Sequence, residues 1–513
     1  MIRDTKIFFV IFLCSLSGLA YEINLMRIFS ISLWYHFAFM VISIAMLGIG
    51  ASGTMLSLYT RLKKPSNIGI YGLSLGISIS LSYVASNQIP FDPVKLSWDR
   101  MQLFYIGLYY LILSTPFLFA GLIIATAFSF ISEKSGLLYG ADLIGAGIGS
   151  VIVLYLMTII GPDKSVFVIS SIALLAAFII GRKGLKTASL IIILLNLLLI
   201  IFHPAFINLR MSQYKGLQVV LKYPGAKHLK TYFNPFSRVD VFKSPAVRFA
   251  PGLSLRYLDA PPEQLGFSID GGEINAITTT RGENAVSPTS PLKFLEYLPS
   301  ALSYEIGKKD AVLILDPRGG LQVLVADYYG SKDIYKIEGN PLLIKIIKKE
   351  LKEFSGNIYS QNTWTGLGRS WLKHSDKSFD IIDISLMGTA PTGSFGISED
   401  YRFTVEAFRE YIGHLKPEGL LSINLFILPP PRIELRLINT IITSMEELGI
   451  KDIEKQTVAI RSWGSICILI KRSPFTSDEI DAIKKFSKDR GFDLIHYPGI
   501  KEEETNIYVR MPS

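Results

Sequence analysis

Hydrophobic residues are distributed very unevenly along the chain. Seven apolar stretches, each near the roughly 20 residues needed to cross about 30 Å of hydrocarbon, fall within the first 205 positions. The third is the weakest candidate because it is rich in Gly and Ser. The pattern predicts an α-helical polytopic membrane domain over residues 1–205. The expected spans lie at approximately 7–29, 34–59, 68–88, 103–131, 138–160, 164–181 and 187–203.

After residue 210 the pattern changes to short strands and helices. Residues 211–305 hold short alternating stretches between turn residues, which predicts a small β-rich lead-in subdomain. Over residues 306–513, buried strands alternate with helices, which predicts right-handed βαβ units and a doubly wound, largely parallel sheet. An antiparallel edge hairpin and a capped terminal helix should complete this domain. The expected strands are 311–316, 333–338, 357–362, 379–385 and 419–426, and the hairpin pairs 454–460 with 465–471.

Composition agrees with a membrane protein. The 513-residue chain has a mean hydropathy of +0.37. Up to Arg210, 14 Lys and Arg residues face 7 Asp and Glu residues, so this half carries most of the net charge of +9. The soluble half lacks the basic excess of a nucleic-acid reader. The two cysteines, Cys14 and Cys467, allow neither a disulfide framework nor a metal site, and we expect no metal.

The loop charges and the expected chemistry disagree about orientation. Basic residues fall at 61–64 and 182–186, and the positive-inside rule makes both loops cytoplasmic. With seven spans, that rule places the soluble half outside. A fold that uses an intracellular cofactor belongs inside. We give more weight to the second argument and expect an inner-membrane protein of bacterial type, with its soluble half in the cytoplasm.

Three ionisable residues interrupt the apolar spans, namely Glu22, Arg27 and Asp142. Such residues usually face a partner or a cavity. Our main interpretation is an internal ion pair, in which Arg27 meets Glu22 or Asp142; a ligand or proton site is the alternative. The spacing of Gly145 and Gly149 favours close helix packing.

The first strand of the α/β half leads into a glycine-containing turn. Residues 316–320 read Asp-Pro-Arg-Gly-Gly. The glycines would let the backbone approach a ligand, and the following helix start offers free N–H groups; a tight turn alone also needs glycine. Glu338 ends the second strand, where an acidic residue can accept both hydroxyls of a ribose or simply cap a helix. Together these features favour nucleoside binding.

Here the chain resembles the spermidine synthase (polyamine aminopropyltransferase) superfamily, and more closely its membrane-fused bacterial members. The membrane segments EINLMRIFSISLWYHFAFMVIS and YGADLIGAGIGS also look like that group, so the resemblance covers nearly the whole chain. The segments of the soluble half that carry it are FSIDGG (267–272), FLEYLPSAL (294–302), VLILDPRGGLQVL (312–324), KIEGNP (336–341), GRSWL (368–372), FDIIDIS (379–385), SEDYRFTVEAF (398–408) and LKPEGLLS (415–422).

The resemblance implies a class I methyltransferase-type sheet that binds S-adenosylmethionine or its decarboxylated form. It also implies particular roles for residues of this chain. The cofactor loop would comprise Asp316, Arg318, Gly319 and Gly320, and Glu338 would hold the ribose. Gly368 and Arg369 would border the adenine.

The chain departs from the family where the acidic groups of aminopropyl transfer should stand. Those positions hold Arg318, Leu367, Ser385 and Gly388, and the Tyr-His-Glu segment of the synthases has no counterpart in SPTSPLKFLEYLP. Aminopropyl transfer needs carboxylates to hold a polycation and to deprotonate the attacking amine. Arg318 could instead attract an anion, such as the carboxylate of intact S-adenosylmethionine. The departures therefore favour methyl transfer.

Candidate catalytic residues remain near the end of the fourth strand. Asp383 lies two residues before Ser385 and on the same strand face, so it could act as a base or be a hydrogen-bonded structural residue. The segment 386–401 is rich in Gly, Ser and Thr and looks like a lid over the strand ends. Its polar groups Ser398, Glu399 and Tyr401 could face substrate, and Ser398 could equally be the N-cap of a helix. We select Asp383, Ser385 and Tyr401 as candidate catalytic residues.

Three hypotheses follow. The first is a membrane-embedded transferase that uses S-adenosylmethionine or a derivative to modify a small-molecule or lipid-associated acceptor. The second is a catalytically degenerate cofactor fold that serves as sensor or scaffold for a transporter-like membrane domain. True polyamine synthesis is the least favoured. The expected partners are the lipid bilayer and the acceptor, without nucleic acid, and the sequence allows a homo-oligomer.

Overall fold

A computed structural model of the protein describes residues 2–34, 37, 39–280, 291–387, 401–427 and 433–501. The chain divides into two compact units, and the predicted lead-in subdomain is shared between them. The first unit comprises Met1–Val219, Thr231–Val239 and Ile269–Gly272, and the second comprises Val220–Lys230, Asp240–Ser268 and Glu273–Ser513.

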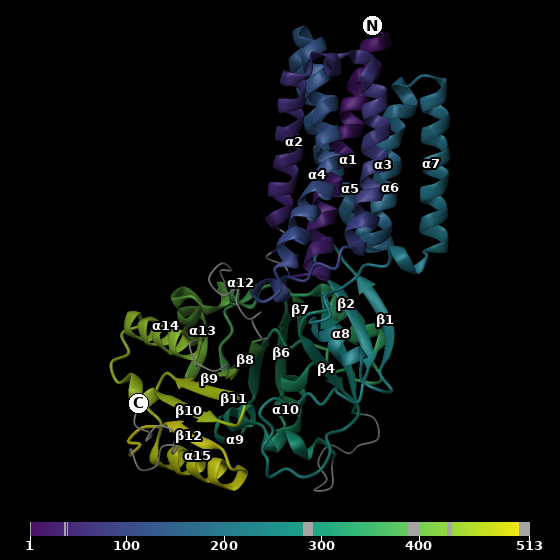
Figure 1. The fold of residues 1–513 in the computed structure, drawn as a ribbon. Helices are drawn as coiled ribbons and strands as arrows, with labels where there is room; N and C mark the ends of the chain where they lie inside the picture. Colours follow the sequence, from purple (N-terminus) through teal and green to yellow (C-terminus); the bar gives the residue numbers. More distant parts are fainter. Residues whose placement is uncertain are drawn as a thin grey trace. The chain divides into compact units, whose positions relative to one another are not determined.

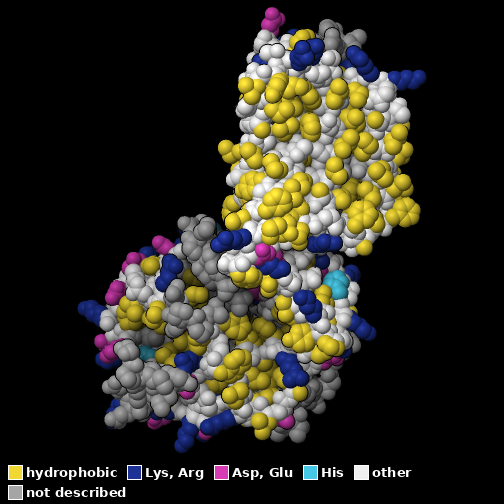
Figure 2. Space-filling view, viewed as in Figure 1, with side chains coloured by type: hydrophobic (Ala, Val, Ile, Leu, Met, Phe, Trp, Pro, Cys, Tyr) yellow, Lys and Arg dark blue, Asp and Glu magenta, His cyan; other side chains and the backbone are white. Residues whose placement is uncertain are grey.

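Among the described residues of the first unit, seven helices are long and apolar enough to cross a membrane, as the sequence predicted. Hydrophobic side chains cover the side of this bundle that Figure 2 shows, whereas Lys and Arg gather at its ends. The second helix begins later than expected, and the Gly- and Ser-rich third stretch is fully helical. The helices are α1 (Ile2–Ser32), α2 (Met40–Leu58), α3 (Ile68–Gln88), α4 (Met101–Phe130), α5 (Ser135–Ile160), α6 (Pro162–Ile180) and α7 (Lys183–Phe202) (Figure 1).

The ionisable residues of the spans find other partners than we expected. Arg27 of α1 forms a two-pronged ion pair with Asp270, at 2.8 and 3.0 Å, and not with Glu22 or Asp142. Asp142 accepts a hydrogen bond from the Ser15 hydroxyl. The predicted internal ion pair is therefore wrong, because the carboxylate that Arg27 meets comes from a turn more than 200 residues away in sequence.

Glycine spacing in α5 serves helix packing, as expected. A Cβ atom at Gly145 would overlap the carbonyl oxygen of Phe12 in α1, and one at Gly149 would overlap that of Leu16. The two glycines thus let α5 approach α1 closely, in the manner of small-residue helix interfaces.

The β-rich lead-in forms a four-stranded sheet after a short helix, α8 (Gly216–Leu221). Strand order follows the sequence, and β3 and β4 pair antiparallel from Gln264 opposite Thr278 to Ser268 opposite Ile274. The strands are β1 (Lys227–Phe233), β2 (Arg238–Lys243), β3 (Gln264–Ile269) and β4 (Ile274–Thr278).

The second unit contains an eight-stranded sheet in the order β12-β10-β11-β9-β8-β5-β6-β7. Strands β7, β6, β5, β8 and β9 are parallel neighbours, and β11 pairs antiparallel with β9. This is a doubly wound sheet of the class I methyltransferase type. Its strands are β5 (Ala311–Leu315), β6 (Asp333–Glu338), β7 (Thr363–Thr365), β8 (Phe379–Met387), β9 (Leu415–Phe426), β10 (Thr457–Arg461), β11 (Ser465–Lys471) and β12 (Asp493–His496).

Two strand predictions need correction. The strand predicted at 357–362 is a turn region, and the short β7 follows it instead. The hairpin of β10 and β11 exists, but β12 pairs with the outer side of β10 and forms the sheet edge. A four-residue strand such as β12 has too few alternating positions for its pattern to stand out.

Helices cover both faces of the large sheet (Figure 1). Alternate residues of β5 enter separate cores: Val312 and Ile314 pack with α9, α10 and α15, whereas Leu313 and Leu315 pack with α12, α13 and α14. The helices are α9 (Leu302–Ile306), α10 (Leu321–Tyr328), α11 (Pro341–Lys345), α12 (Gly368–Lys373), α13 (Val405–Gly413), α14 (Ile433–Glu447) and α15 (Ser477–Arg490).

Candidate functional site

The candidate site lies at the carboxyl ends of β5 and β6, where doubly wound sheets bind ligands. The strand order reverses direction beside β5, since β6 lies on one side and β8 on the other. The turn from β5 to α10 has three left-handed residues, Asp316, Arg318 and Gly320, with φ of 51°, 50° and 83°. Two of them are not glycine, so the turn stores backbone strain of the kind that clusters at functional sites.

Hydrogen bonds from outside the turn hold it in this shape. The Asp316 N–H donates to the carbonyl of Ile337 at 2.8 Å, and the Tyr359 hydroxyl donates to the carbonyl of Arg318 at 2.7 Å. The Arg318 N–H donates to the Glu338 carboxylate at 3.0 Å. The strained conformation is therefore fixed by β6 and by the buried Tyr359, and not by the turn sequence alone.

Glu338 is the last residue of β6 and is only 3% exposed. One carboxylate oxygen accepts the Arg318 N–H and the other accepts the Asn340 N–H at 2.9 Å. Burial, followed by the neighbouring Asp316 carboxylate, raises the pKa of Glu338 above its ordinary value, and the two N–H groups oppose the shift. Each oxygen keeps a second lone pair. Glu338 thus caps the turn and can still accept hydroxyl groups.

Asp316 stands beside Glu338 and is compensated by a cation that the sequence did not reveal. One oxygen accepts the Gly339 N–H at 3.3 Å, and the other accepts the Arg402 guanidinium at 2.8 Å. Arg402 belongs to a short 3-10 turn, Tyr401–Phe403, ahead of α13. The sequence pattern of this segment points only to other polar residues, and the charge of Arg402 alone gives no signal of its pairing with Asp316.

The predicted role of Arg318 changes because its side chain already has a partner. Its guanidinium pairs with Glu273, just ahead of β4, at 2.5 Å. The arginine therefore offers a ligand a matched ion pair and not an isolated positive charge. Glu273 was not among the predicted site residues, because only the folded chain brings it to the turn.

The two glycines of the turn accommodate the protein itself. A Cβ atom at Gly319 would overlap the carbonyl oxygen of Ala276, and one at Gly320 would overlap the side chain of Ile358. Internal packing, the alternative that a tight turn always offers, therefore explains both glycines. Their expected approach to a ligand stays a prediction.

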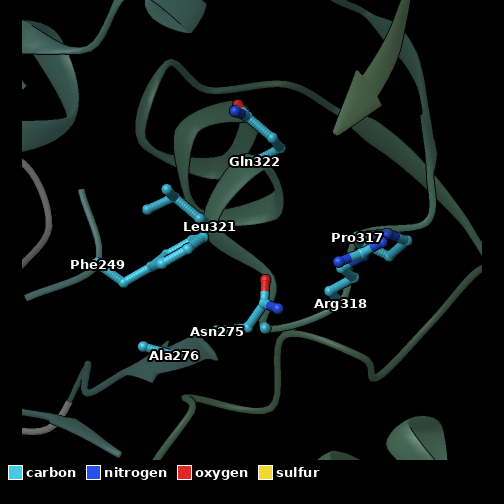
Figure 3. Close-up of a pocket in the computed structure, with 8 residues that line it drawn as sticks. Phe249, Asn275, Ala276, Pro317, Arg318, Leu321 and Gln322 are labelled. Carbon is cyan, nitrogen blue, oxygen red and sulfur yellow. The ribbon is translucent and has the colours of Figure 1, made fainter. Parts of the chain in front are cut away.

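A pocket lies beside the turn, between β4 and the start of α10. It is a small recess that opens to solvent. Figure 3 shows Phe249 and Leu321 on one side and Arg318 on the other, with the Asn275 amide between them. The Oε1 atom of Gln322 is buried and has no hydrogen-bond partner among the described residues. The lining residues are Phe249, Asn275, Ala276, Pro317, Arg318, Gly319, Leu321 and Gln322.

The residues predicted near the adenine lie at the start of α12. Gly368 begins the helix, and a Cβ atom there would lie 2.7 Å from the Leu315 side chain at the end of β5. Arg369 approaches the Thr404 hydroxyl at 3.5 Å. Leu367 is 66% exposed and offers an apolar surface next to these residues.

The candidate catalytic residues do not form a described cluster. Asp383 is completely buried and accepts a hydrogen bond from the Tyr304 hydroxyl at 3.0 Å. Burial raises the pKa of Asp383 to about 7, and hydrogen bonds from Tyr304 and Asn424 oppose the shift. The other carboxylate oxygen, Oδ1, is buried without a hydrogen-bond partner among the described residues. The complete burial of the side chain, away from any described cluster of candidate residues, favours the structural interpretation of Asp383.

The other two candidates are placed by backbone only. Ser385 lies in the last part of β8, and Tyr401 begins the turn that carries Arg402. Ser398, Glu399 and most of the predicted lid lie outside the described residues. Within residues 2–34, 37, 39–280, 291–387, 401–427 and 433–501, no group of acidic, His and Cys side chains could hold a metal ion.

Comparisons with known proteins give matches to solved structures only. No family model and no curated protein matches the sequence. Spermidine synthase from Thermotoga maritima is similar at 16% identity and a TM-score of 0.33, over 56% of this chain and 85% of that one. A probable spermidine synthase from Corynebacterium glutamicum matches at 14% and 0.33, over 51% and 86%. Human methyltransferase-like protein 13, solved with SAH, matches at 13% and 0.26, over 38% and 89%. These likenesses concern the fold.

Proposed function

We propose that the soluble half binds S-adenosylmethionine or its decarboxylated form and transfers a group from it to an acceptor. The observation that carries the proposal is Glu338, a buried acid at the carboxyl end of β6, beside the strained turn that follows β5. Burying a carboxylate next to Asp316 is costly, and such perturbed acids cluster at functional sites. The position is the one at which doubly wound folds hold a ribose.

The residues present fit the adenosine part of such a cofactor. The free lone pairs of Glu338 can accept the two ribose hydroxyls while its N–H contacts stay intact. Leu367 offers an apolar face to the adenine, and Gly368 and Arg369 border it. The bound sulfonium would supply an activated leaving group, so positioning and electrostatics would be the protein's main contribution.

Methyl transfer suits the site better than aminopropyl transfer. A polycationic acceptor needs carboxylates, and the positions expected to provide them hold Arg318, Leu367 and Ser385. The ion pair of Arg318 with Glu273 leaves this edge of the turn without surplus negative charge. A ligand carboxylate, as in intact S-adenosylmethionine, would compete with Glu273 for the guanidinium.

The helical unit suggests what kind of acceptor is modified and where in the cell the protein lies. The seven apolar helices of spanning length in the described part of the chain favour an acceptor that is itself membrane-associated, although a small soluble molecule also fits the proposal. We place the soluble half in the cytoplasm of a bacterial cell, on the side where the cofactor is available. A reporter fused to the C-terminus measures this directly, and an exterior location would contradict the proposal.

A catalytically degenerate binding domain is the second candidate. It is favoured by the glycines of the turn, whose open sides are filled by Ala276 and Ile358, and by the burial of Asp383. In that case the fold would bind a nucleoside as a sensor or scaffold without turnover.

Two measurements on the purified full-length protein separate the candidates. Titration calorimetry with S-adenosylmethionine and with its decarboxylated form should show binding of at least one, and heat from neither would refute the transferase. Incubation of S-adenosylmethionine, labelled on its methyl group, with membrane extract should then yield a labelled product if the protein is a methyltransferase. Binding without any transfer would leave the sensor or scaffold role.

A further inference from the structure

The β3–β4 hairpin belongs to both compact units. Its tip, Ile269–Gly272, belongs to the unit that contains α1, whereas both strands up to Ser268 and from Glu273 belong to the unit that contains β5. Asp270 and Gly271 at the tip are left-handed, with φ of 51° and 66°. The hairpin is therefore a continuous covalent connection, only a few residues long, between two separately packed parts of the chain.

On one side, the tip is clamped to the end of α1. The Asp270 carboxylate accepts hydrogen bonds from both terminal nitrogens of the Arg27 guanidinium, from the Ser30 hydroxyl at 3.2 Å and from the backbone N–H of Arg238 at 2.8 Å. The Lys215 ammonium donates to the Asp270 carbonyl and to the Ser30 carbonyl, both at 2.9 Å. Arg27 and Asp270 are 15% and 19% exposed. Partly buried, two-pronged ion pairs of this kind are among the stronger polar contacts.

On the other side, the same hairpin holds the turn after β5. Glu273, three residues beyond Asp270, pairs with the Arg318 guanidinium at 2.5 Å. The Ala276 carbonyl fills the space left by the missing side chain of Gly319. Two consecutive residues of the candidate cofactor turn, Arg318 and Gly319, thus contact Glu273 and β4.

We propose that the β3–β4 hairpin fixes the position of the cofactor turn while its tip is bound to Arg27 of α1, and releases the turn when the tip leaves Arg27. A hairpin this short transmits displacement, because β3 and β4 stay in register from Gln264 to Thr278. If the tip leaves Arg27, the ion pair of Glu273 with Arg318 and the contact at Gly319 lose their fixed support. If the clamp on α1 raises the affinity of the turn for a ligand by some factor, thermodynamic linkage requires that binding of this ligand strengthens the clamp by the same factor.

The inference concerns the site of the proposed function, but its test needs no cofactor. Amide hydrogen exchange is measured on the full-length, detergent-solubilised protein, comparing wild type with Asp270→Asn. Asparagine tolerates a left-handed backbone and keeps the side-chain shape, so the substitution removes mainly the charge. The matched control is Asp259→Asn, an exposed aspartate ahead of β3.

In Asp270→Asn, exchange should accelerate on the order of tenfold, the scale of one charge-assisted hydrogen bond, in residues 264–278 and also in residues 316–322. The control should match wild type, and peptides from β8 and β9 should be unchanged. Acceleration confined to the hairpin, or no acceleration at all, overturns the proposal. If β8 and β9 also exchange faster, the comparison is repeated with Ser30→Ala, which removes a single hydrogen bond to Asp270. Faster exchange at residues 316–322 with β8 and β9 unchanged then supports the proposal, and unchanged exchange at residues 316–322 overturns it.

The two proposals fail separately. A protein that shows the coupled exchange but binds no form of S-adenosylmethionine would refute the proposed function and retain the coupling. A protein that binds the cofactor but shows no change at residues 316–322 would refute the coupling alone.

Discussion

Asp383 should make the soluble unit less stable as the pH rises, and Asp383→Asn should remove that dependence. Its pKa is about 7 in the folded protein against an ordinary value of 3.8. Because the folded state binds the proton more tightly, the stability that Asp383 contributes is fully present below pH 3.8 and is lost as the pH rises through 7. The full difference is about 4 kcal/mol, of which about 3 kcal/mol is lost between pH 5 and pH 8.

The assay is thermal unfolding followed by tryptophan fluorescence, because Trp364 and Trp371 lie beside the sheet that holds Asp383. For a unit of this size, about 3 kcal/mol corresponds to roughly 6–12 °C in Tm. Wild type should lose that much more Tm than Asp383→Asn between pH 5 and pH 8. Asparagine can still accept the Tyr304 hydroxyl, so the fold should persist.

Glu338 shifts in the same direction, so the variant should keep some pH dependence of its own. The control is the exposed Asp376→Asn, which should follow wild type at both pH values. Equal Tm losses in wild type and Asp383→Asn would refute the burial argument and would restore Asp383 as a solvent-reachable candidate base.

Two further predictions concern glycines whose neighbours leave no room for a side chain. Gly319→Ala would drive a Cβ atom against the Ala276 carbonyl and should lower the free energy of unfolding by about 1–3 kcal/mol, measured by thermal unfolding. The control Gly413→Ala, where no described atom lies within 4 Å of the added Cβ, should keep a stability near wild type. Equal stability of the two variants would contradict the packing at Gly319. In the helical unit, Gly149→Ala should lower the thermal stability of the solubilised protein because it meets the α1 backbone. Gly147→Ala on the same helix faces open space among the described residues and should not.

Much of the fold could be predicted because its signals are local. Span length and apolarity marked seven helices, and the strand–helix alternation predicted the doubly wound sheet. The Pro341 start of α11 and the capped terminal helix were also readable, since a cap depends on neighbouring residues. The segment at 357–362 failed because a few alternating residues do not distinguish a strand from a turn.

The site was harder to predict because its partners are distant in sequence. Arg27 has an acid five residues away, yet it pairs with Asp270. Arg318 looked like a free cation until folding brought Glu273 to it, and Arg402 carried no signal of its contact with Asp316. The place of Glu338 at the end of a strand could be predicted from the pattern, whereas its hydrogen bonds could not, and its role at a ribose stays a prediction.

The central claim is that Glu338 holds the ribose of an adenosyl cofactor. The most direct test is the affinity of S-adenosylmethionine and its decarboxylated form, measured by titration calorimetry for wild type, Glu338→Gln and the exposed control Glu447→Gln. We expect Glu338→Gln to lose about tenfold or more in affinity, the scale of one hydrogen bond to a charged group, while Glu447→Gln binds like wild type. Equal affinity in all three proteins would contradict the account.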